Sequence, residues 1–143
     1  MEQQPILIRL ESLQTTAGET EGVEQEFPGT LTLQEGGWAV SYREPEESGL
    51  GKSFTTLTAA PGKVILDRTG ETACRMVFRE GRRTLGDYTS PYGRFDLEIF
   101  TRKISAALDG AEGKLELHYD LSLEGGEPGE TRMTLTFQKK RME

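Results

Sequence analysis

The sequence has few of the residues that most often carry catalysis, metal binding or covalent cross-links. It contains one cysteine, Cys74, and one histidine, His118. A single thiol forms no intramolecular disulfide, so nothing here implies an oxidising compartment. The sequence also lacks a Gly-x-Ser-x-Gly elbow, a phosphate-binding loop, a dinucleotide-binding fingerprint and a paired metal-ligand motif. We therefore expect no catalytic residue, no metal ligand and no cofactor.

Long hydrophobic segments are missing as well. The apolar run at residues 6–10 is interrupted by Arg9 and is far too short for a signal peptide or a membrane span. No basic segment precedes this run. We expect a soluble cytoplasmic protein that has no membrane partner.

Negative charge predominates but is unevenly distributed. The net charge of −7 and the isoelectric point of about 4.9 argue against a nucleic-acid partner. Residues 1–50 carry ten acidic and two basic side chains, whereas six arginines lie between positions 68 and 94. These arginines either lie on solvated strand faces or form a basic patch for an anionic ligand or an acidic partner surface.

Turn-forming residues recur at short intervals. The 17 glycines and six prolines are spread along the whole chain, and they favour the backbone conformations that hairpin turns require. Every window long enough for a three-turn helix contains Gly, Pro or strand-like alternation, so helix is confined to single turns at residues 44–48 or 104–109. The length of 143 residues favours a single domain spanning residues 1–143.

Alternation of apolar and polar residues predicts β-strands between these turns. The alternation is clearest at residues 115–123 and recurs at 6–10, 38–42, 95–99 and 133–137. After residue 99 the apolar set changes phase, which predicts a β-bulge within one long strand. The later apolar positions are Phe100, Ile104, Ala106 and Leu108.

The strands predict an all-β fold built from a single antiparallel sheet. We count eight to ten strands in sequence order, joined by short connections. Closing such a sheet into a mostly meander barrel removes its edges and encloses its apolar face. A two-sheet sandwich is the alternative, but the long crossover of a Greek key is missing.

Several short motifs occur in an order and spacing typical of one protein family. They are Tyr-x-Glu at 42–44, Thr-Thr-Leu at 55–57, Arg-Thr-Gly at 68–70, Thr-x-Pro-Tyr-Gly at 89–93 and Gly-x-Leu-x-Leu-x-Tyr at 113–119. In combination they resemble the YwiB-like proteins, small bacterial proteins of unknown function. This resemblance implies a closed barrel similar to calycins and lipocalins and carries over no catalytic residue. The acidic segment at residues 19–26 departs from the pattern and leaves the start of the second strand open.

Four residues near the hexapeptide at residues 88–93 are candidates for binding a ligand. If Arg68 or Arg94 points into the barrel, its charge needs a carboxylate or a ligand anion as a partner. Tyr88 and Tyr92 would offer hydroxyl groups nearby. The alternative is architectural, with Arg68 holding a turn and Tyr92 packed beneath a hairpin. Cys74 is expected to be a buried apolar residue, and His118 an exposed one on the polar side of its strand.

These features leave three functional hypotheses. The first is a non-catalytic module that binds a small, partly apolar or anionic ligand in the barrel. The second is a homodimer or protein-interaction module with a filled barrel, because Ile65 and Val77 lie in the middle of consecutive apolar runs and must point outward. The third is an enzyme that uses Arg94, Tyr88, Tyr92 and Glu98 at the barrel mouth.

Overall fold

Ten antiparallel strands form a closed barrel in which each strand pairs with its neighbours in sequence and β1 pairs with β10. A computed structural model describes residues 2–110 and 112–140. The barrel of the described residues is thus a complete meander, and its ten strands lie within the eight to ten that the sequence predicted. The elements are β1 (Glu2–Thr16), β2 (Glu19–Gln34), β3 (Gly37–Arg43), the 3-10 helix η1 (Glu46–Ser48), β4 (Ser53–Ala60), β5 (Lys63–Gly70), β6 (Ala73–Arg79), β7 (Arg83–Ser90), β8 (Gly93–Asp109), β9 (Glu112–Leu123) and β10 (Gly129–Lys139).

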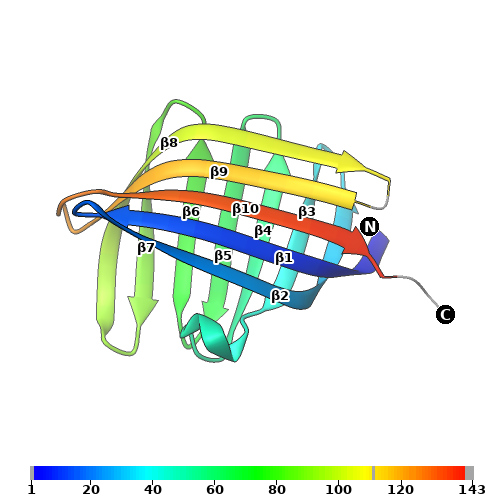
Figure 1. The fold of residues 1–143 in the computed structure, drawn as a ribbon, viewed down its shortest axis with the longest axis horizontal. Coiled ribbons are helices and arrows are strands. Elements are labelled where there is room, and N and C mark those ends of the chain that lie inside the picture. The colour runs from blue at the N-terminus through cyan, green and yellow to red at the C-terminus, as the bar shows by residue number, and fades with distance from the viewer. Residues whose placement is uncertain (1, 111, 141–143) are drawn as a thin grey trace.

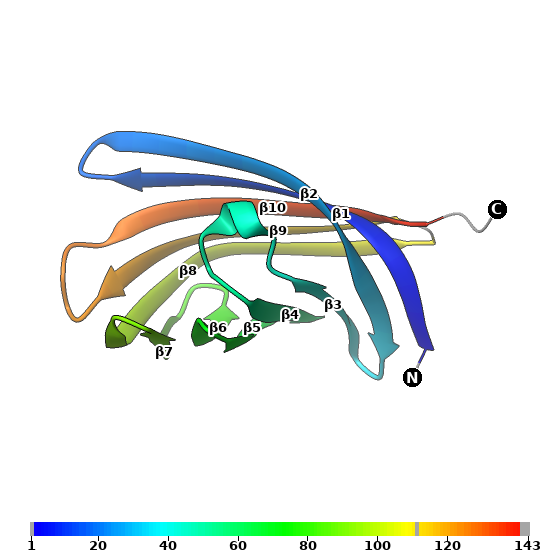
Figure 2. The same ribbon diagram turned by 90° about the horizontal axis from the view of Figure 1, so that it is seen from below.

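The barrel is flattened into two walls whose strands cross steeply. Strands β1, β2, β8, β9 and β10 run across the front in Figure 1, and β3 to β7 stand nearly upright behind them. The two walls are separate layers in Figure 2, where the far ends of the β1–β2 hairpin and of the β9–β10 connection extend beyond β3 to β6. The front strands are the long ones, so part of their length has no opposite wall.

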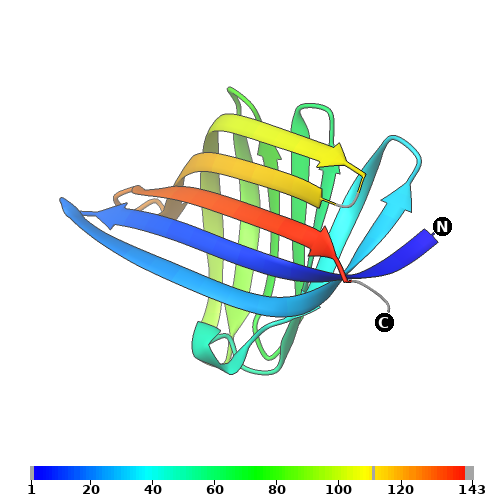
Figure 3. The same cartoon turned by 45° about the vertical axis from the view of Figure 1, so that its right-hand side comes forward.

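Strand β2 passes from one wall to the other, as Figure 3 shows. Only its last part, residues 30–34, pairs with β3, whereas residues 19–33 pair with β1. The change of direction lies next to Gly29, where a Cβ atom would lie 2.9 Å from the carbonyl oxygen of Ser41 and would overlap the side chain of Ile8. A glycine is needed because the backbones approach closely at this bend.

Strand β8 contains the predicted β-bulge. Its pairing with β9 shifts register between Thr101 and Lys103. The inward residues are odd-numbered up to Thr101, and after the shift the even-numbered Ile104 packs against the core. Phe100 lies on the outer face, within 5.7 Å and 6.0 Å of the guanidinium carbons of Arg83 and Arg102. Residues 104–109 are strand, so of the two places left open for a helical turn only residues 46–48 form one.

The inner face of the back wall consists of three rows of directly paired residues. The first two rows are apolar and buried, and they fill the barrel between the walls. Aromatic contacts join them to the front wall, with ring centroids 5.4 Å apart for Trp38 and Phe137 and 4.7 Å apart for Phe78 and Tyr119. The first row is Trp38, Ala59, Val64 and Phe78, and the second is Val40, Leu57, Leu66 and Met76.

The outer edge of β2 is unpaired along most of its length. Among the described residues, positions 19–29 pair with β1 on one side and have no strand on the other. Unpaired strand edges invite association with other chains, and natural proteins protect them with charge and proline. This edge carries Glu19, Glu21, Glu24, Glu26 and Pro28. The acidic segment is therefore part of a strand, and its composition suits an exposed edge.

Candidate functional site

The third inner row of the back wall is polar at its centre. Its members are paired one to the next across β3 to β8, and all lie on the inward side of their strands. The row lies at the end of the barrel away from the β2–β3 and β4–β5 turns. It consists of Tyr42, Thr55, Arg68, Cys74, Tyr88 and Phe95.

Arg68 is the centre of this row. Its Nε donates a hydrogen bond to Oγ1 of Thr55 at 2.9 Å, and its Nη2 lies 3.7 Å from Oε1 of Glu44. The side chain keeps only 13% of its exposure, and that of Glu44 keeps 4%. A guanidinium and a carboxylate therefore face each other inside the barrel. Removing each of these ions from water costs on the order of several kcal/mol.

Glu44 is incompletely satisfied in this position. It follows β3, and its backbone N–H donates to the carbonyl oxygen of Ser53 at 2.8 Å, which anchors the residue. Its second carboxyl oxygen, Oε2, is buried and accepts no hydrogen bond from the described part of the chain. Burial raises the pKa of Glu44, and the attraction of Arg68 and a hydrogen bond with Thr55 only partly offset that rise.

The neighbouring titratable groups also respond to burial and to Arg68. Burial raises the pKa of Tyr42, and the nearby Glu44 carboxylate raises it further, while Arg68 opposes both effects. Burial raises the pKa of the Cys74 thiol to about 11. Tyr119, on the opposite wall, has a pKa raised by burial and lowered in part by a hydrogen bond with Thr131 and by Arg68. These shifts favour the uncharged forms at neutral pH, and the protonated thiol of Cys74 is a weaker nucleophile than a thiolate.

Aromatic side chains flank the Arg68 and Glu44 pair. The ring of Phe27 on β2 lies 4.6 Å from that of Tyr42, close to where β2 leaves β3. At the other end of the row the ring centroids of Tyr88 and Phe95 are 6.4 Å apart, and both residues are half-buried. The polar pair therefore lies within a largely aromatic and apolar surround, which is typical of ligand sites in which few polar groups fix orientation.

The structure brings two of the four predicted site residues together. Arg68 and Tyr88 lie in the same inward row, with Cys74 between them. Tyr92 is 93% exposed in the β7–β8 turn. Arg94 points outward with 69% of its side chain exposed, 3.8 Å from Asp87. Whether any of the four binds a ligand stays a prediction.

The polar cluster considered for an enzyme is divided between the two faces of the sheet. Glu98 alternates with the buried Leu97 and Ile99, so it faces outward, where Oε1 accepts a hydrogen bond from Nη1 of Arg83 at 2.8 Å. Tyr88 faces inward on the neighbouring strand. These side chains therefore do not converge on one reaction centre.

Glu44 is the residue that the sequence reasoning missed. The alternation of Trp38, Val40 and Tyr42 continues by two residues to Glu44, and this signal would have placed its carboxylate inside the barrel. The segment from residue 44 was interpreted as room for a helical turn, but the turn begins only at Glu46.

His118 lies on the outer face of β9 and pairs with Glu130 on β10. Their Nε2 and Oε2 atoms are 2.6 Å apart, and this hydrogen bond lowers the pKa of Glu130. Within residues 2–110 and 112–140, no three His, Cys, Asp or Glu side chains are grouped closely enough to hold a metal ion. The pair is a surface contact between strands.

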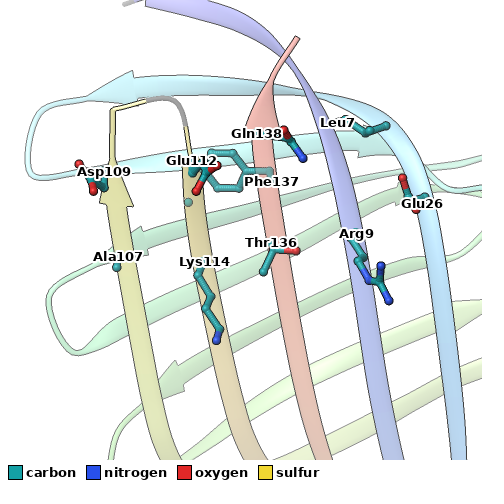
Figure 4. A pocket seen from close by; sticks show the side chains of 11 residues that line it. Leu7, Arg9, Glu26, Ala107, Asp109, Glu112, Lys114, Thr136, Phe137 and Gln138 are labelled. Carbon is teal, nitrogen blue, oxygen red and sulfur yellow. The ribbon is translucent and has the colours of Figure 1, made fainter.

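A shallow hollow of about 450 Å³ lies on the outside of the front wall. Its side chains come from β1, β2, β8, β9 and β10, and Figure 4 shows them with the strands of the back wall behind. Its basic residues already have acidic partners, since Arg9 pairs with Glu11 and Glu24, and Nζ of Lys114 lies 3.2 Å from Glu116. Such paired surface charges offer little to a ligand.

Another hollow, of about 580 Å³, lies at the far end of the barrel from Arg68. It is lined by the β2–β3 and β4–β5 turns and by residues 104–106 of β8. Its lining has no charged side chain, so the Arg68 end is the chemically better defined site.

Comparison with known proteins supports the same fold. The "Uncharacterized beta-barrel protein YwiB" of Bacillus subtilis (strain 168) is 26% identical to this chain over 134 residues, which cover 94% of this chain and 93% of that protein. The crystal structure of the ywiB protein from Bacillus subtilis matches with a TM-score of 0.87 and 25% identity, covering 97% of this chain and 94% of that chain. The resemblance predicted from sequence motifs is thus confirmed.

The family assignment comes from a match over most of the chain. The model of a domain of unknown function, DUF1934, matches residues 8–135, which include all ten strands in whole or in part. The chain therefore belongs to the DUF1934 family.

Proposed function

We propose that the protein is a non-catalytic module that binds a small molecule at the Arg68 end of the barrel. The observation that carries the proposal is the inward-facing pair of Arg68 and Glu44. The Oε2 atom of Glu44 is buried and accepts no hydrogen bond from the described residues. The remaining inner rows of the back wall are apolar and closely packed. A few polar groups in a largely apolar surround are the arrangement that fixes the orientation of a small ligand.

Stability alone is a poor reason for this pair. Replacing a buried ion pair by apolar residues of similar size is often neutral or stabilising by about 1 to 4 kcal/mol. The neighbouring inner row has buried apolar residues at the corresponding positions of β5 and β6, Leu66 and Met76. Charged residues at an interior position therefore favour a role in recognition over one in packing.

The proposed ligand is small. The first two inner rows leave the middle of the barrel filled, so a ligand would reach only the third row. Half-buried Tyr88 and Phe95 would contact its apolar part, and Arg68 its polar part.

A fragment and metabolite screen by two-dimensional NMR tests this proposal. We expect bound compounds to shift amide signals of the third inner row, and Arg68→Met to abolish those shifts. Arg94→Met is the matched control, because it removes an arginine that is 69% exposed on the outer face. Binding that is confined to outer-face residues, or that survives Arg68→Met, would contradict the proposal.

A second candidate function is homodimer formation through the outside of the back wall. Five uncharged residues on the outward side form one row across β2 to β6, so the middle of this face offers an uncharged strip to a second copy, between rows that carry Asp67 with Arg75 and Lys63 with Arg79. Light scattering after size-exclusion chromatography tests it, and we expect Ile65→Lys with Val77→Lys to convert a dimer to a monomer. A monomeric unmodified protein would exclude this candidate. The row is Thr32, Ala39, Thr58, Ile65 and Val77.

A further inference from the structure

We infer that the polar end of the ligand is an uncharged, amide-like group that carries a carbonyl oxygen and an N–H side by side. This inference rests on the proposed function, because it concerns the same Arg68 and Glu44 pair. It goes further in stating which chemical class the pair would select and which classes it would reject.

Charge balance argues against an ionic ligand. The guanidinium of Arg68 and the carboxylate of Glu44 together have no net charge, and both are largely removed from water. A ligand carboxylate near Arg68 would lie close to the like charge of Glu44, and a ligand ammonium would lie close to Arg68. Such repulsion is strong where water is excluded, so a neutral polar group fits best.

The hydrogen-bonding pattern points to an amide. The Nε of Arg68 donates a hydrogen bond to Thr55. Its Nη2 lies 3.7 Å from Oε1 of Glu44, which is longer than the roughly 2.7 to 2.9 Å of a direct charge-assisted hydrogen bond. The guanidinium therefore retains N–H donors, and Oε2 of Glu44 retains acceptor capacity. An amide satisfies both, since its carbonyl oxygen accepts from Arg68 while its N–H donates to Glu44.

The geometry favours access from the Arg68 side of the pair. Arg68 retains 13% of its side-chain exposure, whereas Glu44 retains 4%. A ligand would thus meet the guanidinium first and reach the carboxylate behind it. Because a buried carboxylate gains from any added donor, the N–H of the ligand supplies the selectivity.

Three six-carbon probes that differ only in their polar group test the inference. Hexanamide, hexanoate and hexylamine would be titrated separately into labelled protein near neutral pH, and third-row amide shifts followed by NMR. We expect hexanamide to bind about tenfold more tightly than either ion, which corresponds to about 1.4 kcal/mol.

Glu44→Gln sharpens the test because it leaves the charge of Arg68 unbalanced. We expect this variant to reverse the order, so that hexanoate binds more tightly than hexanamide. Glu46→Gln is the matched control, since it removes one carboxylate two residues away at an exposed position. This control should keep the order of the unmodified protein.

The possible outcomes separate the inference from the proposed function. Hexanoate or hexylamine binding at the third row as tightly as hexanamide would overturn the inference and leave the binding module standing. An order that Glu44→Gln does not change would also overturn it. If no probe shifts any third-row signal, the amide inference is rejected, and the fragment screen with Arg68→Met decides on the binding module.

Discussion

The ring of Phe137 lies directly over Gly113 on the neighbouring strand. The two residues are paired in register between β10 and β9, and a Cβ atom at position 113 would overlap the ring. Phe137 is 3% exposed, and its ring packs edge-on against the ring of Trp38 on the opposite wall. An aromatic ring that covers a glycine on the next strand helps to fix the register of the two strands.

Gly113→Ala is expected to lower the free energy of unfolding by about 1 to 3 kcal/mol, because the added methyl group forces the Phe137 ring from its place. Chemical denaturation measures the change. Lys114→Ala, on the exposed face of the same strand, is the control and should change stability by no more than about 0.5 kcal/mol. Equal stability of Gly113→Ala and the unmodified protein would show that the ring does not occupy this position.

Arg68 and Glu44 should contribute unequally to stability. Arg68→Met leaves a buried carboxylate without a partner and is expected to cost about 3 kcal/mol. Glu44→Gln leaves the guanidinium of Arg68 without its partner, but this side chain retains 13% exposure against 4% for Glu44, so we expect a smaller loss than for Arg68→Met.

The double variant Arg68→Met with Glu44→Gln checks this asymmetry. It should be more stable than Arg68→Met alone, because the buried negative charge is gone. Urea denaturation of the four proteins gives the interaction energy. A double variant that is as unstable as the sum of both single changes would mean that the two side chains do not interact.

Much of the barrel could be predicted from alternation alone, and the exceptions have physical causes. The bulge in β8 is visible as a change of phase because the inner face must stay apolar on both sides of it. The start of β2 was left open because its glutamates have low intrinsic strand preference, and pairing with β1 decides the matter. The bend at Gly29 was not predicted, since only the surrounding backbone distinguishes it from a turn glycine.

The candidate site was only half visible in the sequence. Arg68 continues the inward alternation of Val64 and Leu66, but the apolar Ile65 between them obscured which face was the inner one. Arg94 was grouped with Tyr88 by nearness to the hexapeptide, although it precedes the inward Phe95 and so faces outward. Nearness in sequence does not place two strand residues on the same face.

Stability should depend on pH through Glu44. Its pKa in the folded protein is raised above the ordinary 4.5, mainly by burial. The folded state therefore holds the proton more tightly, and the stabilisation is full below the ordinary value and is lost as pH rises through the raised pKa. Relative to Glu44→Gln, the unmodified protein should lose unfolding free energy across this window.

Paired denaturation curves from acid to neutral pH measure this difference. Glu46→Gln, compared in the same way, controls for the loss of one carboxylate at an exposed position. A difference between the unmodified protein and Glu44→Gln that stays flat, or that rises with pH, would contradict the placement of Glu44 inside the barrel.

The acidic residues of β2 should keep the protein from associating through its open edge. In the part of the chain that the structure describes, residues 19–29 have backbone groups without a strand partner on one side, and Glu21, Glu24 and Glu26 place like charges against any second copy of the edge. Replacing these three by threonine removes the repulsion and raises strand preference. We expect concentration-dependent association, measured by light scattering after size-exclusion chromatography.

A control variant replaces three other exposed glutamates by threonine, Glu35, Glu112 and Glu127. It makes the same change in net charge and should leave the elution unchanged. Equal association of both triple variants would assign the effect to net charge rather than to the edge, and no association of either would show that the charges are not what protects it.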